Sequence, residues 1–199
     1  SFENFDIIFT NGDYQKKELE LIEQKYDLKK KLMINNGNFF YDYLKKTIHH
    51  EKLENKKILF APSWNHNEKN LFADYAIKII DLLLSNNFSV ILRPHPEHFK
   101  RNKNIIDEIR SKFNENSNFE LDQKISNVES MEKSSIVITD NSAIVLEFHL
   151  ILRRPIIYLN YMDRIHNKNF EEIKIESINE VFKKEFGKII DIKELDSLP

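Results

Sequence analysis

The sequence predicts an α/β protein in which a parallel sheet is covered by helices on both faces. Short apolar runs alternate along the chain with longer stretches in which apolar residues recur every three or four positions, which is the alternation of strand and helix. The runs are apolar at nearly every position, as in parallel strands that are buried on both faces. Because crossovers between such strands are right-handed, we expect a Rossmann-like three-layer arrangement.

Each expected element follows from its own pattern. Strands are expected at apolar runs, at residues 58–61, 89–93, 136–139 and 155–159. Helices are expected where apolar residues follow the 3.6-residue period, at residues 71–83, 105–113 and 143–152. Asn70 is placed to cap the first of these helices, and Asn141 or Ser142 is placed to cap the third. Further elements are expected nearer the ends: a strand at 6–10, a helix from residue 13, and a helix at 178–186 that ends at Gly187.

The composition excludes several classes of protein. With 41% hydrophobic and 31% charged residues among 199, the chain can bury a core, and its net charge of −2 argues against charge-driven binding to nucleic acid. The absence of Cys excludes disulfides, thiol catalysis and thiolate zinc sites, which favours a cytoplasmic location. Only 3 Gly are present, so a glycine-rich phosphate loop of the GxGxxG type cannot form. No apolar run is long enough to span a membrane, and because the chain starts at Ser1 without a signal peptide, we expect it to be part of a longer protein.

Several of the expected strands end in polar residues that have no place in a core. These strand tips are residues 61–65, 93–98 and 139–142. In an open parallel sheet the carboxyl ends of the strands face one crevice, where ligands bind, so we expect the tips to converge on one site. At the first tip, Ser63 is expected to donate to phosphate, and Trp64 either stacks on a ring or packs at the rim of the core.

The tip at residues 139–142 precedes a helix, whose first N–H groups and dipole favour an anion. Ser142 and the amides after it would donate to phosphate oxygens, and the alternative is ordinary capping of the helix. Glu147 lies inside this otherwise apolar helix, and a buried carboxylate requires a partner. That partner is either a ribose diol or a salt bridge to Arg153 or Arg154.

The tip at residues 93–98 carries Pro94 and Pro96, which stiffen it and aim His95. Beside a polyphosphate, a protonated His95 would donate to the leaving oxyanion; the alternative is a ring packed in a rigid loop. Arg93 either clamps phosphate or pairs with an acid. Pro96 prevents the regular helical turn that would present His95 and His98 to a metal ion, so no metal site is expected.

The motifs follow the order found in one protein family. Residues 61–65 are similar to a family motif, Ala-Pro-Thr-aromatic-Arg after a strand, with Asn65 in place of Arg. Residues 93–96 match a His-Pro motif, and residues 139–142 match Ser/Thr-Asp-x-Ser-Ser, with Ala143 in place of the second Ser and Glu147 as the acid that follows. Residues 154–158 match a basic-Pro-Ile-Ile-aromatic strand, with Asp163 as the Asp beyond it. By these motifs the chain resembles the CDP-glycerol glycerophosphotransferase family, of the teichoic-acid-polymerase type, whose catalytic part has the two-domain GT-B fold.

The resemblance implies that residues 51–199 are the nucleotide-donor-binding domain, the carboxy-terminal half of a GT-B fold. Residues 1–50 are then the end of the acceptor-side domain and the linker. The donor implied is a CDP-linked polyol, and His95 is implied as the catalytic residue. The residues implied around the donor diphosphate and nucleotide are Ser63, Arg93, His95, Asp140, Asn141, Ser142, Ala143 and Glu147. Neither a metal ion nor another cofactor is implied.

The implied reaction is phosphoryl transfer in the synthesis of a cell-surface polymer. The hydroxyl of a polyol or saccharide acceptor attacks the distal phosphorus, and CMP leaves. Members of the family work on lipid-linked or surface-polymer acceptors at the inner face of the membrane, which leaves peripheral membrane contact of the whole protein open. The family's Trp-His-Gly motif, whose His is thought to act as the base, is absent from this sequence. The general base is therefore expected outside this chain, and the chain alone is expected to be inactive.

Other functions stay open at this point. A GT-B glycosyltransferase, such as a sialyl- or capsule-sugar transferase, has the same architecture, and fold cannot separate the two. A sugar-nucleotide 2-epimerase fits less well, because it would carry Ser-Gly-Gly where this chain has Ser142 and Ala143. A non-catalytic nucleotide-binding or interaction domain could also keep the sheet.

Overall fold

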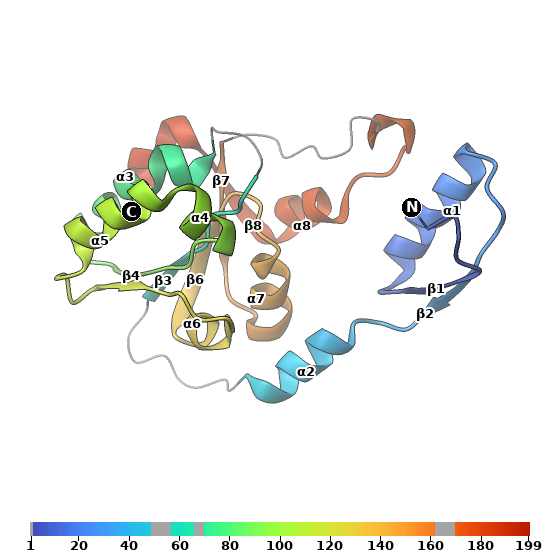
Figure 1. Cartoon of the computed structure of the whole chain (residues 1–199), viewed down its shortest axis with the longest axis horizontal. Coiled ribbons are helices and arrows are strands. Elements are labelled where there is room, and N and C mark those ends of the chain that lie inside the picture. Colours follow the sequence, from blue (N-terminus) through green and yellow to red (C-terminus); the bar gives the residue numbers. More distant parts are fainter. Residues whose placement is uncertain (1, 49–56, 66–69, 162–169) are drawn as a thin grey trace. The chain divides into compact units, whose positions relative to one another are not determined.

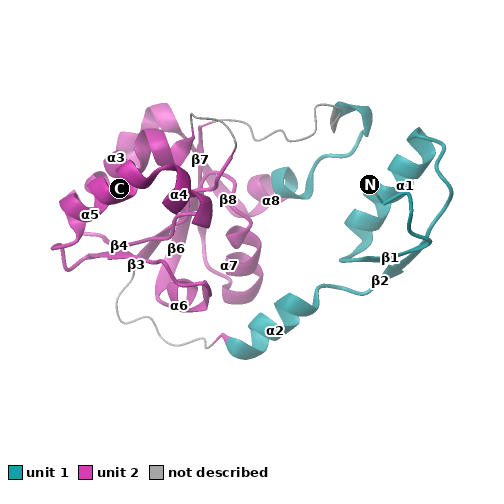
Figure 2. Ribbon diagram, in the orientation of Figure 1, with its two compact units in different colours: residues 1–47, 165–181 teal, residues 48–164, 182–199 magenta. Residues whose placement is uncertain are grey.

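The computed structural model describes residues 2–48, 57–65, 70–161 and 170–199 (Figure 1). The chain forms two compact units, shown in Figure 2: Ser1–Thr47 with Ile165–Val181, and Ile48–Arg164 with Phe182–Pro199. The expected domain boundary after residue 50 falls within residues 49–56, outside the described residues. That boundary stays a prediction.

The first unit is built around a β-α-β arrangement. β1 (Ile7–Thr10) and β2 (Leu32–Asn35) pair in parallel, and α1 (Asp13–Lys25) connects them. The Thr10 hydroxyl, fully buried, donates to Asn35 Oδ1 at 2.5 Å, which fixes the ends of the two strands together. α2 (Phe39–Thr47) and the 3-10 helix η1 (Phe170–Glu172) belong to the same unit. The expected strand at 6–10 and the helix from residue 13 are confirmed.

The second unit contains a six-stranded sheet in which every neighbouring pair is parallel. Its strands are β3 (Lys57–Phe60), β4 (Ser89–Leu92), β5 (Phe119–Leu121), β6 (Ser134–Thr139), β7 (Ile156–Asn160) and β8 (Gly187–Asp191). The order across the sheet is β5-β4-β3-β6-β7-β8, so the chain moves outward in one direction from β3 and then in the other from β6 (Figure 1). The expected α/β fold with a parallel sheet is confirmed, and β5 and β8 are strands that the apolar pattern did not predict.

Helices connect the strands of this sheet, and one 3-10 helix follows the last strand. They are α3 (Leu71–Ser85), α4 (Pro96–Arg101), α5 (Lys103–Phe113), α6 (Val128–Glu132), α7 (Ile144–Leu152), α8 (Ile178–Phe186) and the 3-10 helix η2 (Ile192–Ser197). Asn70 caps α3 as predicted, because its side-chain oxygen accepts the amide of Ala73 at 3.0 Å. Gly187 directly follows α8, also as predicted, and begins β8.

The main hydrophobic core of the second unit lies between the sheet and the helices α3 and α5. It is formed by alternating residues of the strands, such as Ile58 and Phe60 of β3, together with the apolar face of α3. That face consists of Leu71, Phe72, Ala76, Ile79, Ile80 and Leu83, each at most 1% exposed. Leu59, between the two core residues of β3, is also fully buried, so the strand is covered on both faces as its continuous apolar run predicts.

The first unit exposes several large apolar side chains. In β1 and β2, Ile7, Phe9 and Leu32 are 50%, 66% and 59% exposed.

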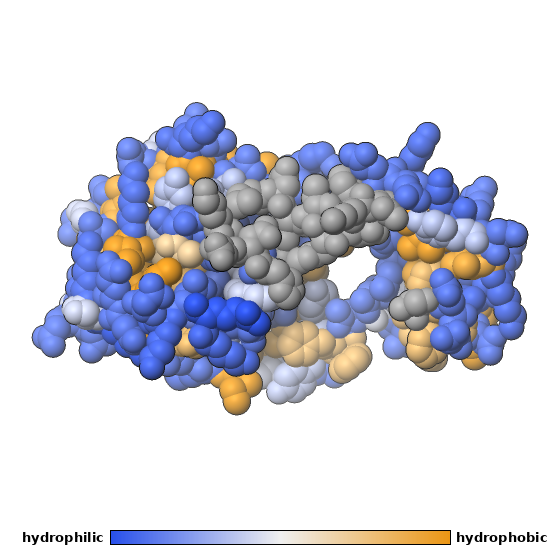
Figure 3. All heavy atoms as spheres, turned by 45° about the horizontal axis from the view of Figure 1, so that its top comes forward, coloured by the Kyte–Doolittle hydropathy of each residue, from blue (hydrophilic) through white to orange (hydrophobic). Residues whose placement is uncertain are grey.

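Figure 3 shows hydrophilic residues over most of the visible face, with apolar residues between them. No helix in the described part of the chain is long and apolar enough to cross a membrane.

Gly187 supplies a test of the packing between the last two strands. A Cβ at this position would lie 2.3 Å from two ring carbons of Tyr158, and that ring is only 2% exposed. We predict that Gly187→Ala lowers the free energy of unfolding by about 1–3 kcal/mol, because the ring has no space into which to move. Urea unfolding followed by circular dichroism measures the change. Lys188→Ala, at the exposed next position, is the control and is expected to change stability by less than about 0.5 kcal/mol; equal stability of the two variants would contradict the prediction.

Candidate functional site

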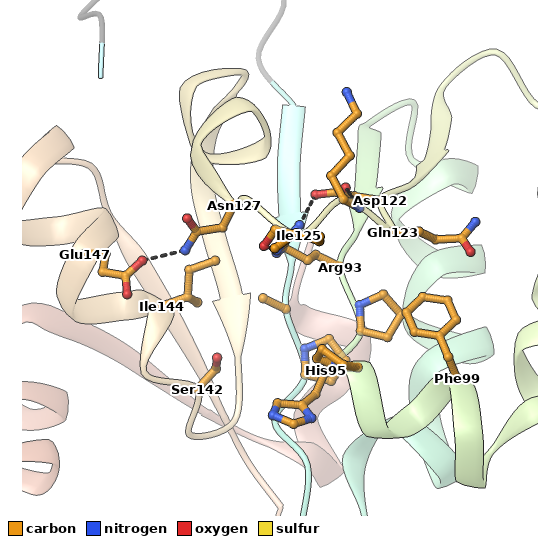
Figure 4. A pocket seen from close by; sticks show the side chains of 15 residues that line it. Arg93, His95, Phe99, Asp122, Gln123, Ile125, Asn127, Ser142, Ile144 and Glu147 are labelled. Atoms are coloured by element: carbon orange, nitrogen blue, oxygen red, sulfur yellow. Dashed lines mark hydrogen bonds and ion pairs between the residues drawn. The ribbon is translucent and has the colours of Figure 1, made fainter. Parts of the chain in front are cut away.

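A cavity of about 430 Å³ opens at the carboxyl edge of the six-stranded sheet (Figure 4). Its walls come from the segments that follow β3, β4 and β5 and from the start of α7. The lining residues are Ala61, Pro62, Arg93, Pro94, His95, Pro96, Phe99, Asp122, Gln123, Lys124, Ile125, Asn127, Ser142, Ile144 and Glu147. This volume lies in the range of pockets that hold small-molecule ligands. The structure thus brings residues from all the predicted tips to one edge, together with a segment that was not predicted.

His95 lies at the exit of β4 and lines the cavity. It is the N-cap of α4, where its Nδ1 accepts the amide of Glu97 at 3.2 Å. Because Nδ1 accepts a hydrogen bond, the neutral ring carries its proton on Nε2. The ring also stacks on Trp64, with centroids 6.0 Å apart, and the guanidinium of Arg101 lies 5.5 Å from the Trp64 ring centre. The exit of β4 therefore holds His95 in place, while Trp64 packs beside it and does not line the cavity.

Arg93 pairs with an acid, which was one of its two predicted roles. Its Nη1 donates to Asp122 Oδ2 at 2.5 Å, and its Nη2 donates to the carbonyl oxygen of Ile125 at 3.1 Å. The Asp122 side chain is 2% exposed and accepts further hydrogen bonds from the Ser130 hydroxyl and the amide of Lys124. Arg93 therefore lines the cavity, but its guanidinium donates hydrogen bonds to the segment after β5.

The segment at residues 122–127 is the part of the cavity wall that sequence analysis missed. It follows the short edge strand β5, and it contributes Gln123, Lys124, Ile125 and Asn127 to the lining. The Ile125 side chain is fully exposed, at 104%, although its carbonyl is fixed by Arg93. The available signal was Asp122 after the alternating residues of 119–121, which is another polar residue at the end of a strand.

Ser63 and Asp140 bind each other and do not line the cavity. The amide and the hydroxyl of Ser63 donate to the two carboxylate oxygens of Asp140, each at 2.7 Å. Ser63 is 4% exposed, so its hydroxyl is engaged within the protein and does not face a ligand. This pair ties the tip of β3 to the tip of β6. Asn141 and Ala143 likewise lie outside the cavity lining.

The start of α7 differs from the prediction. Its N-cap is Ala143, without a side-chain hydrogen bond, so the expected capping by Asn141 or Ser142 is wrong. The reason is that the Thr139 hydroxyl accepts the amide of Ser142 at 3.3 Å, and carbonyl oxygens of the first turn accept the amides of residues 145 and 146. Among the described residues, no acceptor is present for the amides of Ala143 and Ile144. These two N–H groups and the Ser142 side chain give the helix start the character of an anion site.

Glu147 lines the cavity one turn into α7, and its partner is Asn127. Oε2 of Glu147 accepts Asn127 Nδ2 at 2.5 Å (Figure 4). Burial raises the pKa of Glu147, against the opposing effects of the Asn127 hydrogen bond and the charge of Arg93. The predicted alternative of a salt bridge to Arg153 or Arg154 is wrong.

The physical reason is the course of the chain after α7. Arg153 ends the helix in the left-handed conformation, with φ of 56°. Arg154 Nη1 then donates to the carbonyl oxygens of Met131, Glu132 and Ser134 at 2.8, 2.8 and 2.6 Å, so it points away from Glu147. Glu147 is thereby left beside the cavity with only a neutral amide donor.

His98 does not share a ligand set with His95. It is fully buried, and both of its ring nitrogens face polar groups of the protein. Within the described residues, no group of three or more His, Cys, Asp or Glu side chains could hold a metal ion. Asp163, the last residue of the family motifs, falls within 162–169 and so outside the described residues.

The second unit is a parallel α/β sheet flanked by helices, and its cavity lies at the carboxyl edge of the sheet, where such folds bind ligands. Residues 12–172 match the family described as CDP-glycerol:poly(glycerophosphate) glycerophosphotransferase. The chain belongs to this family.

Two solved structures show the same fold. The wall teichoic acid polymerase TagF is 18% identical, with a TM-score of 0.56 over 98% of this chain and 47% of that chain. A putative UDP-N-acetylglucosamine 2-epimerase from Listeria monocytogenes is also 18% identical, with a TM-score of 0.55 over 85% of this chain and 45% of that chain. The chain thus spans about half the length of each. Comparison with curated proteins gives no match.

Glu147 supplies a test of the electrostatics of the cavity. Glu147→Gln keeps an oxygen for Asn127 and removes a charge that burial disfavours, so we predict that it raises the free energy of unfolding at pH 7 by about 1 kcal/mol. Burial raises the folded-state pKa of Glu147 above the ordinary value of 4.5. The charged carboxylate therefore destabilises the folded chain fully at a pH above the folded-state pKa, and this destabilisation disappears as the pH falls below 4.5. Urea unfolding at pH 7 and pH 4 measures both effects.

Glu185→Gln, on an exposed position of α8, is the control for the loss of one negative charge. It is expected to change stability by less than about 0.5 kcal/mol at either pH. If Glu147→Gln is no more stable than the wild type at pH 7, the buried charge of Glu147 does not destabilise the fold and the prediction is wrong.

Proposed function

We propose that this chain is the donor-binding half of a glycerophosphotransferase that uses CDP-glycerol or another CDP-linked polyol. Membership of the family supports this proposal, and one observation carries it. A single cavity at the carboxyl edge of the sheet is lined by His95, Ser142 and Glu147, beside two amides at the start of α7 that have no acceptor among the described residues. Hydrogen-bond donors for an anion and an acceptor for a hydroxyl are therefore close together in one site.

The diphosphate of the donor would bind at the start of α7. The amides of Ala143 and Ile144 have no protein acceptor in the described part of the chain, and the helix dipole adds positive potential there. The Ser142 hydroxyl and the Nε2–H of His95 supply further donors on opposite sides of the cavity. Ser63 and Asp140, which were also proposed from the sequence, would hold the surrounding loops in place through their hydrogen bonds and would not contact the ligand.

The ribose would bind at Glu147. One carboxylate oxygen is bonded to Asn127, and within the described residues the other has no hydrogen-bond donor. A partly buried carboxylate is stabilised by a hydroxyl that donates to it, and a ribose diol offers two.

The cytosine would lie on the segment at residues 122–127. There the exposed side chain of Ile125 and the ring of Phe99 offer apolar surface. The side-chain nitrogen of Gln123 offers a donor, while its Oε1 accepts Arg110 Nη2 at 2.9 Å. The segment is held by Arg93 and Asp122, so this wall of the cavity is formed before a ligand arrives.

In the proposed reaction, the oxygen of an acceptor hydroxyl forms a bond to the distal phosphorus. The bond from that phosphorus to the bridging oxygen breaks, CMP leaves with this oxygen, and the hydroxyl proton passes to a base outside the chain. His95 stabilises the departing oxyanion through Nε2–H. The acceptor of the whole protein is a polyol or a saccharide.

Nucleotide binding is the direct test. CMP has about 21 heavy atoms, and at roughly 0.3 kcal/mol each it would bind with about −6 kcal/mol, or a Kd of tens of micromolar. We predict this affinity in calorimetry of the chain with CMP, and a preference for CMP and CDP-glycerol over UDP. Absence of heat at millimolar ligand would remove the donor site, and a preference for UDP would indicate a glycosyltransferase.

Loss of His95 tests catalysis in the full-length enzyme. We predict that His95→Ala lowers kcat about 10²- to 10³-fold with little change in the KM for the donor, because the contact strengthens as charge develops on the leaving oxygen. Product formation from CDP-glycerol measures it. Lys100→Ala, on the exposed side of the same helix α4, is the control and should leave kcat unchanged. An unaltered product yield with His95→Ala would favour a non-catalytic domain.

A further inference from the structure

His98 is completely buried, although it follows the cavity residue His95 by only three positions. Its ring stacks on Phe72 of α3, with centroids 4.2 Å apart. Burial lowers the pKa of His98, while its hydrogen bonds to Asn102 and Ser63 and the charge of Asp140 oppose the shift. The ring is therefore neutral at pH 7 and above.

The hydrogen bonds of His98 define which ring nitrogen carries the proton. Nε2 lies 3.1 Å from the carbonyl oxygen of Ser63, and a carbonyl oxygen only accepts, so the proton is on Nε2. Nδ1 lies 2.8 Å from Oδ1 of the Asn102 side-chain amide. The oxygen and nitrogen of an amide exchange places by rotation about its last bond, so Asn102 can donate to Nδ1 of the neutral ring. In that rotated orientation, Asn102 favours the tautomer that donates to Ser63.

Ser63 connects this histidine to the start of α7. Its carbonyl accepts from His98, while its amide and hydroxyl donate to both carboxylate oxygens of Asp140 at 2.7 Å. Asp140 is followed directly by the turn that contains Ser142, whose amide bonds the Thr139 hydroxyl. One continuous set of hydrogen bonds thus runs from α4 through the loop after β3 to the turn before α7.

We propose that His98 is a positioning residue of the donor-phosphate site. Neutral His98 fixes the carbonyl of Ser63, and the pair of Ser63 with Asp140 fixes the turn that presents Ser142 and the unpaired amides of α7. This inference rests on the proposed function, because it explains how the same phosphate site is held. It assigns a role to a residue that does not line the cavity.

The alternative is that His98 serves only to pack against Phe72. An apolar side chain of similar size would fulfil that role, but it would leave the Ser63 carbonyl buried without a donor. A carbonyl in that position can recover a partner by turning toward water, and the amide and hydroxyl of Ser63 would move with it. The contact with Asp140 would then weaken, so the two roles predict different behaviour of a variant that packs but cannot donate.

The experiment compares variants of the chain by calorimetry with CMP and by the NMR amide signals of residues 142–144. His98→Leu keeps the packing and loses both hydrogen bonds, whereas His98→Gln keeps a donor for Ser63. Phe113→Leu, in the core on α5, is a control that perturbs packing at a residue outside the cavity lining and the hydrogen-bond set. We expect His98→Leu to weaken CMP binding about tenfold and to shift these signals, and His98→Gln to stay within about threefold of the wild type. Phe113→Leu should bind CMP as the wild type does, even where it is less stable.

Each result decides between the two roles. Wild-type affinity and unshifted signals in His98→Leu would overturn the positioning role and leave the proposed function intact. Equal weakening by His98→Leu and His98→Gln at equal thermal stability would also overturn it, because the hydrogen bond would not matter. A wild-type chain that binds no cytidine nucleotide would overturn the proposed function, and the positioning role with it. If His98→Leu does not fold, Asn102→Ala takes its place: about threefold weaker binding is expected, and unchanged binding overturns the inference.

Discussion

The candidate site depends on the position of β3, which pairs in parallel with both β4 and β6. Because the chain leaves β3 toward one side of the sheet and leaves β6 toward the other, the loops after these strands separate and a crevice opens at their carboxyl ends. Hydrogen bonds join the two sides below the crevice. The Thr139 hydroxyl donates to the carbonyl of Ala61 at 2.7 Å, and Ser63 binds Asp140. The cavity therefore has a rigid floor made of backbone and short polar side chains.

Polar residues at this edge divide into pairs that hold the walls together and residues outside those pairs that face the cavity. Arg93 and Asp122 hold the segment after β5, and this nearly buried ion pair contributes more to orientation than to net stability, because desolvation offsets much of its attraction. Ser63 and Asp140 do the same between β3 and β6. His95, Ser142 and Glu147 are left to face the cavity. Residue type alone does not separate the two groups, since each contains a serine and an acid.

The sequence predicted the sheet well because buried parallel strands are apolar at every position, and it predicted the cap of α3 because Asn70 acts within its own helix. It missed β5, an edge strand of three half-buried residues with Glu120 in the middle. It also missed the partner of Glu147, because Asn127 lies in the segment that β5 positions, 20 residues earlier in the chain. The cap of α7 was mispredicted for a similar reason. The hydroxyl of Thr139, at the end of β6, accepts the amide of Ser142, whereas the capping rule considers only residues next to the helix. Contacts within one element were predictable, and contacts that need the assembled sheet were not.

The charges along the cavity also constrain the direction in which a donor can bind. The unpaired amides at the start of α7 favour an anion, whereas Glu147, one turn further along the same helix, repels one. In the proposed complex, the diphosphate therefore lies near Ser142, and the uncharged, hydroxyl-bearing part of the ligand lies toward Glu147 and the segment at residues 122–127. Burial raises the pKa of Glu147, so a charged carboxylate at this position opposes folding. Under the proposed function, a ligand that donates hydroxyl groups to the carboxylate offsets that cost, and a nucleoside diphosphate bound in this direction would place its ribose at that point.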